Sequence, residues 1–292
     1  MTKTISVIVP VYGELDEPSY LLALQKEVKN FQEEIELILV FDDTGTKKSQ
    51  SNFKIISRLQ QSNVEIYRSS FGSPGKARNY GLQKAKGEWL IFSDADDSPN
   101  IQEFLRMVST GGKLNKDVCI GSYMSINLVN GKKNRFDTDP KNLRMSYKSI
   151  ADSPGIWRFA FKRNTLGDIT FPNLRMGEDQ VFLIEYFSSS RSILFYQPTV
   201  YTYHTGINGQ LTSDGLVRKK ISNALKLSTF KYKRAVISDS NEMLIRMIIN
   251  QALSTVKYGK TKDKIFGIRI IMKFKYILLS QFFRREGSKY EK

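Results

Sequence analysis

The first hundred residues alternate between short apolar runs and longer stretches with helical spacing, and this alternation limits the possible folds more than any other feature. The apolar runs, each typical of a strand, lie at residues 5–9, 36–41, 64–67 and 89–92. The helical stretches between them lie at about residues 18–31, 54–59 and 75–86. Such alternation predicts an α/β fold with a mostly parallel sheet flanked by helices, in which ligands bind beyond the carboxyl ends of the strands.

The pattern becomes looser beyond residue 117 and changes again near residue 216. Further strands are expected at 117–128, 193–196 and 199–204, with a turn at Asn130-Gly131. From about residue 216 the spacing is helical and the composition is basic. We therefore predict a sheet domain at residues 1–215 and a basic helical C-terminal region at residues 216–292.

The 292-residue chain carries a net charge of +16, which points to a polyanionic partner such as nucleic acid, anionic lipid or a phosphate-rich substrate. Residues 1–217 hold 26 Lys and Arg against 24 Asp and Glu, whereas residues 218–292 hold 19 against 5. The charge excess therefore belongs to the C-terminal region, and the first part is nearly neutral.

Cys119 is the only cysteine, which excludes an intramolecular disulfide framework and a cysteine-cage zinc site and suits a reducing, cytoplasmic compartment. The charged start runs directly into a strand-like segment, so no signal peptide is expected. No window of about 18 uncharged apolar residues occurs, so no membrane-spanning helix is expected.

Acidic side chains follow two of the expected strands. Asp94, Asp96 and Asp97 come directly after the run at 89–92 and would repel one another unless a cation or hydrogen-bond donors compensate. Oxygen ligands of this kind suit Mg²⁺ or Mn²⁺, although an acidic turn that caps the next helix is the alternative. Asp43 follows the run at 36–41, where it is either an acceptor for a nucleotide base or ribose, or part of an ordinary turn.

The segment from Gly75 to Gly81 opens a helix after a Ser-Pro turn. Its backbone amides, with Lys76 and Arg78 beside them, are suited to hold an anion such as a diphosphate. The spacing of a Walker P-loop is absent. A basic surface turn is the alternative.

Two further candidates lie later in the chain. Glu178 and Asp179 begin an apolar helical stretch, where one of them is either a general base or a helix-terminal acid stabilised by the helix dipole. His204, the only histidine, cannot form a multi-histidine metal site but can supply one nitrogen ligand to a carboxylate-held metal; a structural role is the alternative.

Taken in order over residues 4–215 or so, these segments resemble the inverting nucleotide-sugar glycosyltransferases of family 2, of the bacterial surface-polysaccharide type. Those enzymes have the GT-A fold, a Rossmann-like, mostly parallel sheet. The segments that carry the resemblance are Ile5–Tyr12 with its Pro-x-Tyr turn, Phe41–Gly45, Gly75–Gly81, the Asp-x-Asp-Asp motif at Asp94–Asp97, Trp157–Arg163, Phe171-Pro172, and Gly177-Glu178-Asp179. Thr44-Gly45 replaces the family's usual Gly-Ser, a mild departure.

The resemblance implies roles for these residues. The donor nucleotide would be bound by Pro10, Tyr12, Asp43, Lys76, Arg78, Asp94 and Asp96. A divalent ion, Mn²⁺ or Mg²⁺, would be held by Asp96 with Asp97 and His204, and would neutralise the departing diphosphate. Asp179, with Glu178 as second choice, would be the base that activates the acceptor hydroxyl for an inverting displacement. Trp157 would stack on the acceptor sugar, or would be a core aromatic.

The basic C-terminal region predicts a partner of its own. On a helical wheel Lys262, Arg269 and Lys273 share one face with apolar residues around the rest, although Lys275 breaks the pattern. This arrangement suits in-plane binding to an anionic membrane. A helix that packs on the sheet domain with exposed lysines is the alternative. We therefore expect a metal-dependent glycosyltransferase, peripheral on the inner face of the plasma membrane. It would use a nucleotide diphosphate sugar, chiefly a UDP-sugar, and a glycan or lipid-linked acceptor, and would not bind nucleic acid.

Two alternative functions remain open from the sequence. A non-catalytic basic module that binds nucleic acid or membrane would explain the C-terminal region but not the acidic clusters. A GT-A-like nucleotidyltransferase would share the metal-binding acids, but is expected to have a Gly-rich basic loop after its first strand, and Pro10-Val11-Tyr12-Gly13 has no such character.

Overall fold

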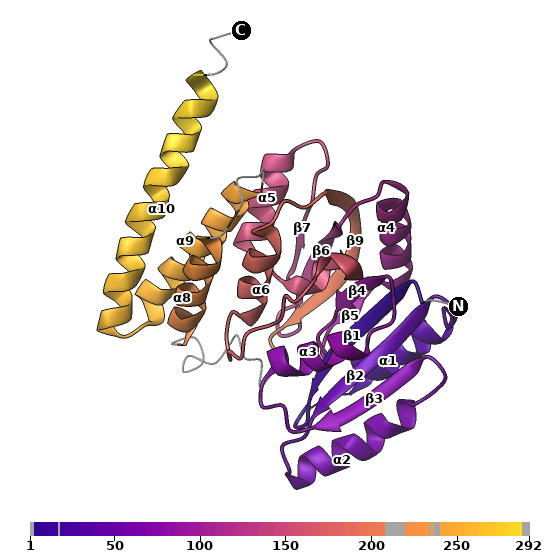
Figure 1. Cartoon of the computed structure of the whole chain (residues 1–292). Helices are drawn as coiled ribbons and strands as arrows, with labels where there is room; N and C mark the ends of the chain where they lie inside the picture. Colours follow the sequence, from indigo (N-terminus) through magenta and orange to yellow (C-terminus); the bar gives the residue numbers. More distant parts are fainter. Residues whose placement is uncertain (1–2, 17, 208–219, 234, 236–239, 288–292) are drawn as a thin grey trace. The chain divides into compact units, whose positions relative to one another are not determined.

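The computed structural model describes residues 3–16, 18–207, 220–233, 235 and 240–287, with the side chains of the last helix described as far as Lys275 (Figure 1). It divides into two compact units. The first comprises residues 1–146, 155–173 and 191–208, and the second comprises residues 147–154, 174–190 and 209–292. The boundary predicted at 215/216 lies outside the described residues, so the division into those two parts stays a prediction.

The first unit contains a nine-stranded sheet in the order β3-β2-β1-β4-β8-β6-β9-β5, with β7 paired to β6. Its strands are β1 Ile5–Tyr12, β2 Ile35–Asp42, β3 Val64–Ser69, β4 Trp89–Phe92, β5 Ser98–Pro99, β6 Val118–Asn127, β7 Lys133–Phe136, β8 Phe159–Lys162 and β9 Ile193–Thr205. The four strands β3, β2, β1 and β4 are parallel, and so is the long β6–β9 pair, whereas β8 is antiparallel to β4 and β6. The expected mixed α/β architecture with a mostly parallel sheet is confirmed.

Helices cover both faces of this sheet. They are α1 Ser19–Lys29, α2 Lys47–Ile56, α3 Pro74–Lys84 and α4 Ile101–Lys113, with short 3-10 turns η1 Ser57–Leu59, η2 Ile156–Arg158 and η3 Arg163–Thr165. Buried side chains of α1, α2 and α4 pack with the odd-numbered residues of β1 in one apolar core. On the other face α3 approaches so closely that a Cβ at Gly81 would lie 2.4 Å from Cγ2 of Ile8.

The strand β1 continues through Pro10, where the sequence had indicated its end. In β1 the even-numbered residues bond toward β4, as the bond from the Ser93 N–H to the Ile8 carbonyl shows. The β1–β4 ladder ends at the pair Ile8 and Phe92. Pro10 therefore lacks its N–H on the side where no partner strand needs it, and the strand tolerates it.

The two strands expected at 193–196 and 199–204 are one continuous strand, β9, and this part of the prediction was wrong. Gln197 and Pro198 interrupted the apolar pattern in the sequence. In the structure the β6–β9 register shifts next to Ser122, an irregularity that accommodates the extra residues without ending the strand.

The second unit is helical. Its helices are α6 Glu178–Phe187, α8 Ile221–Tyr232, α9 Asn241–Tyr258 and α10 Thr261–Gly287, while α5 Leu143–Asp152 crosses from the first unit into the second. Val181, Ile221 and Ala224 form an apolar cluster between α6 and α8. The helical character predicted for the C-terminal region is confirmed for these described segments. Within the described ranges, no helix is both long and apolar enough to cross a membrane.

Two glycine substitutions test the close approach of α3 to the sheet. We expect Gly81→Ala to lower the free energy of unfolding by about 1–3 kcal/mol, because the added methyl group must displace Ile8 in a packed layer. Gly112→Ala in α4 is the matched control, since an added Cβ there meets nothing within 4 Å. That change should stabilise the protein by up to about 1 kcal/mol. Urea unfolding measures both, and equal effects of the two changes would contradict the packing described.

Candidate functional site

The carboxyl ends of β1, β2 and β4 lie at one edge of the sheet, because these neighbouring strands are parallel. Tyr12 ends β1 beside Asp42 at the end of β2, and its side chain is 56% exposed. Asp43 follows directly, and the segment Asp94–Asp97 follows β4. The structure therefore brings the predicted residues Pro10, Tyr12, Asp43, Asp94 and Asp96 to the same edge.

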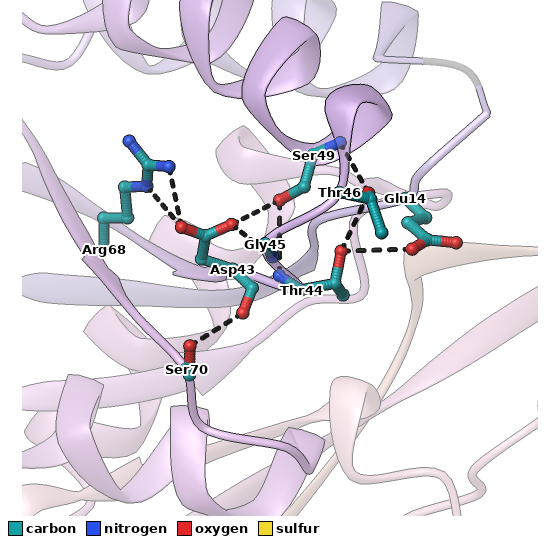
Figure 2. A network of polar contacts seen from close by, with 8 residues as sticks. All are labelled: Glu14, Asp43, Thr44, Gly45, Thr46, Ser49, Arg68 and Ser70. Atoms are coloured by element: carbon teal, nitrogen blue, oxygen red, sulfur yellow. Dashed lines mark hydrogen bonds and ion pairs between the residues drawn. The ribbon is translucent and has the colours of Figure 1, made fainter.

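Asp43 is the centre of a polar network at this edge (Figure 2). Its Oδ1 accepts hydrogen bonds from the Gly45 N–H at 3.0 Å and the Ser49 hydroxyl at 2.7 Å. Its Oδ2 accepts from Nε of Arg68 at 2.9 Å and forms an ion pair with Nη2 of Arg68 at 2.6 Å. These donors, the Gly45 amide first, lower the pKa of Asp43 to about 2, so the side chain is ionised at neutral pH. The carboxylate thus uses its four acceptor positions.

The neighbouring Asp42 has a different task. Its carboxylate accepts hydrogen bonds from the backbone N–H groups of Phe71 (2.6 Å) and Gly72 (2.9 Å), which fixes the loop that leads from β3 to α3. Sequence reasoning identified neither this role nor Arg68. Arg68 lies 25 residues from Asp43, and only the pairing of β2 with β3 brings the two together.

The basic segment at the start of α3 places its two cations differently. Ser73 caps the helix, and Lys76 is exposed in its first turn. Arg78 is 5% exposed, and its Nη2 donates to Oδ1 of Asp94 at 2.8 Å. Arg78 therefore compensates the charge of Asp94, whereas Lys76 is the cation that faces solvent.

The acidic segment is organised by two residues of β9. The Tyr201 hydroxyl donates to Oδ2 of Asp97 at 2.9 Å and accepts from the Asp94 N–H at 3.0 Å. The His204 N–H donates to Oδ1 of Asp97 at 2.7 Å, and Nδ1 of His204 lies 3.1 Å from the Asp96 carbonyl oxygen. When Nδ1 donates this bond, Nε2 is the ring nitrogen that carries the lone pair. Tyr201 thus connects the two ends of the acidic segment through its hydroxyl group, and sequence reasoning missed it.

Asp97 is 2% exposed, and burial, with the charges of Asp94 and Asp96 as smaller causes, raises its pKa well above the ordinary value. Its two oxygens accept hydrogen bonds from Tyr201 and His204, so the geometry favours a supporting role for Asp97 over the predicted role as a metal ligand. Asp96 is partly exposed and better placed to meet an ion.

The acidic segment can supply only some of the ligands that a divalent ion needs. Among the described residues, no group of three or more His, Cys, Asp and Glu side chains is arranged to hold a metal ion. Asp96 and the His204 ring beside its backbone offer fewer than three such ligands. Such a site fits an ion whose remaining ligands come from substrate phosphates and water, as is usual for Mg²⁺.

Trp157 belongs to an aromatic cluster of the first unit. Its ring stacks on Tyr201 and Tyr203, with ring centroids 4.7 Å and 5.4 Å away, and it meets Tyr123 edge-on. Only 6% of the residue is exposed. The structure therefore favours the core-aromatic alternative over stacking on an acceptor sugar.

Glu178 and Asp179 lie in the second unit, at the start of α6. Gly177 precedes them with φ 78°, a left-handed conformation that glycine adopts without strain. Glu178 is buried at 8% exposure, whereas Asp179 is partly exposed and its Oδ1 accepts from the Gln180 N–H at 2.8 Å. Of the two acids, Asp179 is the more accessible.

Comparison with known sequences identifies relatives. The family described as "Glycosyl transferase family 2" matches residues 6–171. The "Poly(ribitol-phosphate) beta-glucosyltransferase" of Bacillus spizizenii is 27% identical over 244 residues, which is 80% of this chain and 38% of that protein. The "Poly(ribitol-phosphate) beta-N-acetylglucosaminyltransferase TarS" of Staphylococcus aureus is 27% identical over 216 residues, which is 73% of this chain and 37% of that protein. The chain thus spans less than two fifths of the length of these two relatives.

Solved structures share the fold. Residues 1–349 of S. aureus TarS, in complex with UDP-GlcNAc, align with a TM-score of 0.67 and 19% identity over 93% of this chain and 80% of that chain. The mannosyltransferase PcManGT from Pyrobaculum calidifontis, in complex with GDP-Man and Mn²⁺, aligns with a TM-score of 0.55 and 13% identity over 91% of this chain and 79% of that chain. At these identities the likeness establishes the fold, and the expected GT-A type of α/β fold is confirmed.

The role of Tyr201 can be tested with one missing hydroxyl. We expect Tyr201→Phe to lower the free energy of unfolding by about 1–3 kcal/mol, because it leaves an oxygen of the buried Asp97 and the Asp94 N–H without this partner. Tyr196→Phe is the matched control, since its hydroxyl donates to Glu103 in a partly buried place where water can replace it. Denaturant unfolding of both variants is the measurement. An equal or smaller loss for Tyr201→Phe would show that the hydroxyl does not hold the segment.

Proposed function

Because the chain belongs to glycosyl transferase family 2, we propose that it transfers a sugar from a nucleotide diphosphate sugar to a hydroxyl group of a glycan or lipid-linked acceptor. The observation that carries the proposal is the edge of the first unit, where the Asp43 network and the acidic segment Asp94–Asp97 follow adjacent parallel strands around β1. Such an edge is where α/β sheets bind ligands. The proposed reaction inverts the anomeric configuration in a single displacement.

The nucleotide would bind across the ends of β1 and β2. Pro10 and the exposed ring of Tyr12 provide an apolar surface for a base, and Asp43 provides its acceptor. Oδ1 of Asp43 already accepts two hydrogen bonds, and both Nε and Nη2 of Arg68 lie against Oδ2, so a base N–H that binds there must displace a donor. The Arg68 side chain, at 38% exposure, is the donor that can leave at the least cost.

The diphosphate would lie between α3 and the acidic segment. Lys76 faces solvent in the first turn of α3, where backbone N–H groups also favour an anion. Arg78 would act by holding Asp94 in place, since its guanidinium is buried against that carboxylate. Asp94, held in this way, would bind the ribose or the metal ion.

We propose Mn²⁺ or Mg²⁺ as the cofactor, held by Asp96 and assisted by His204. When bound, the ion would neutralise the charge that develops on the leaving diphosphate. Asp97 would not be a ligand but would position His204 and the turn through its hydrogen bonds. The Mn²⁺ in the PcManGT complex supports this assignment by likeness of fold alone.

The acceptor hydroxyl requires a base. We propose Asp179 for this task, because it is the more accessible of the two acids at the start of α6, with Glu178 as the second choice. The base removes the hydroxyl proton as the oxygen attacks the anomeric carbon and the nucleoside diphosphate departs. No covalent sugar–enzyme intermediate is needed.

The relatives support a narrower substrate class. TarS is described in complex with UDP-GlcNAc, and both curated relatives are named for transfer to poly(ribitol phosphate). We therefore propose a UDP-sugar as donor and a phosphate-containing surface polysaccharide or its lipid-linked precursor as acceptor. A nucleotidyltransferase or a non-catalytic module gains no support from these relatives.

We also propose that the basic region at 216–292 binds an anionic membrane surface, on the inner face of the plasma membrane, while residues 1–215 form the transferase domain. The concentration of positive charge after residue 217 supports this partner. A peripheral position there would bring the enzyme to a lipid-linked acceptor.

Asp96→Ala tests the metal and nucleotide site without relying on turnover. With Mn²⁺ present, UDP at a hundred times its Kd should stabilise the unchanged protein by about 2.7 kcal/mol, seen as a rise in Tm of several degrees. We expect Asp96→Ala to lose most of this rise. Asp168→Ala, which removes an exposed acid outside the cluster, is the control and should keep it. Equal rises in both variants would remove Asp96 from the site.

Asp179→Asn tests the base. We expect nucleotide binding to remain, because Asp179 is not assigned to the donor, while the rate of sugar transfer falls by a factor of about 10²–10⁴. Glu178→Gln is the matched variant and should keep most of the transfer rate if it still folds. The opposite pattern would assign the base to Glu178. A full rate in both would exclude these acids as the base.

A further inference from the structure

One side of α10 is held against the second unit. Oδ1 of Asp263 accepts from Nζ of Lys226 in α8 at 3.2 Å. At Gly267 the helix comes so close to α9 that an added Cβ would lie 3.0 Å from the Ala252 carbonyl oxygen. Phe274 is 3% exposed, and its ring centroid lies 5.3 Å from that of Tyr232. Spacings of four and seven residues place these contacts on one side of the helix, so its rotation within the unit is fixed.

The opposite side of α10 carries an exposed apolar strip. We call Ile265, Ile268 and Met272 the outer strip; they are 49%, 47% and 70% exposed. Their spacing of three and four residues aligns them along the helix, and at about 100° per residue the strip faces away from the side that packs on α8 and α9. In the sequence the same spacing continues at Tyr276, Leu279 and Phe283.

Cations border the outer strip on both sides. By helical position Lys262, Arg269 and Lys273 lie along one border, and Lys264 and Lys275 along the other; all five are exposed. The acid of this stretch, Asp263, lies on the packed side with Lys226. The exposed half of the described helix is therefore an apolar strip between two positive borders. The sequence wheel placed Lys262, Arg269 and Lys273 on one basic face, and Lys275 lay outside that face. In the structure Lys275 lies with Lys264 on the second border.

This combination distinguishes between polyanionic partners. Nucleic acid binds cations through its phosphates, but its backbone offers no apolar layer for the outer strip. A membrane surface offers both, anionic headgroups at the height of the lysines and acyl chains just below. Lys and Arg side chains can extend their charged ends to the headgroups while their methylene groups lie along the apolar boundary.

We infer that α10 lies in the plane of an anionic membrane surface, with the outer strip inserted at the acyl boundary and the two positive borders on the headgroups. The inference rests on the membrane partner proposed above and identifies the surface that makes the contact. It predicts that binding has an apolar part, which resists salt, and an electrostatic part, which does not.

Vesicle co-sedimentation of the full chain tests the inference. The unchanged protein should bind vesicles that contain phosphatidylglycerol and should bind pure phosphatidylcholine at least tenfold more weakly. Ile268→Ser with Met272→Ser should weaken binding to the anionic vesicles at least tenfold at both low and high salt. Replacing Lys262, Arg269 and Lys273 by Gln should also weaken binding and should reduce its salt dependence.

Controls separate the possible failures. Phe230→Ser and Leu253→Ser remove apolar residues that are each 50% exposed in α8 and α9, outside the strip, and should leave vesicle binding unchanged. Circular dichroism shows whether each variant folds, and hydrolysis of the nucleotide sugar in solution shows whether the transferase site is intact. Normal hydrolysis without any vesicle binding would overturn the membrane partner but not the transferase proposal.

Two further outcomes would overturn the inserted strip itself. The first outcome is that the variant with Ile268→Ser and Met272→Ser still binds vesicles, whereas the variant with Gln at the three basic positions does not. Binding would then be purely electrostatic, without insertion of the outer strip. The second outcome is that the unchanged protein forms a dimer, the variant with Ile268→Ser and Met272→Ser is a monomer, and neither binds vesicles. The outer strip would then be a contact between two copies of the chain.

Discussion

The central constraint in this protein is the pairing of β1 with parallel strands on both sides. Because β2 and β4 run in the same direction as β1, the chain leaves all three strands at one edge. Asp43 and the segment Asp94–Asp97 are far apart in the sequence, yet this pairing makes them neighbours along that edge. The close packing of α3 at Gly81 and the ion pair between Arg78 and Asp94 depend on the same sheet. The proposed donor site is thus a consequence of strand direction.

Charge inside the site is balanced locally. Three aspartates within four residues would repel one another, and the fold separates their tasks. Asp94 pairs with Arg78, Asp97 is buried under the Tyr201 hydroxyl and the His204 N–H, and Asp96 keeps partial exposure. This division explains how the segment remains folded, and it leaves Asp96 as the carboxylate that we propose for a divalent ion. The large positive charge of the chain lies elsewhere in the sequence, after residue 217, and the inferred membrane contact of α10 would use part of it.

The sequence allowed the early strands, the mostly parallel sheet and the main acidic residues to be predicted, because strand periodicity and clustered aspartates are local signals. What it missed depends on contacts between distant residues. Tyr201 meets Asp97 across 104 positions, and Arg68 meets Asp43 across 25. No pattern of residue spacing predicts that a tyrosine on a later strand will hydrogen-bond to an earlier turn. Trp157 was ambiguous for the same reason, since only the tertiary structure places its ring among Tyr123, Tyr201 and Tyr203.

The central claim is that the edge formed by β1, β2 and β4 binds and activates a nucleotide diphosphate sugar. The most direct measurement is the release of nucleoside diphosphate from a panel of nucleotide sugars by the purified chain, with Mn²⁺ and without any acceptor. We predict slow release from one or a few UDP-sugars, and loss of that release when Mn²⁺ is chelated. Uniformly absent release across the panel, together with no binding of any nucleotide in a calorimetric titration, would contradict the account.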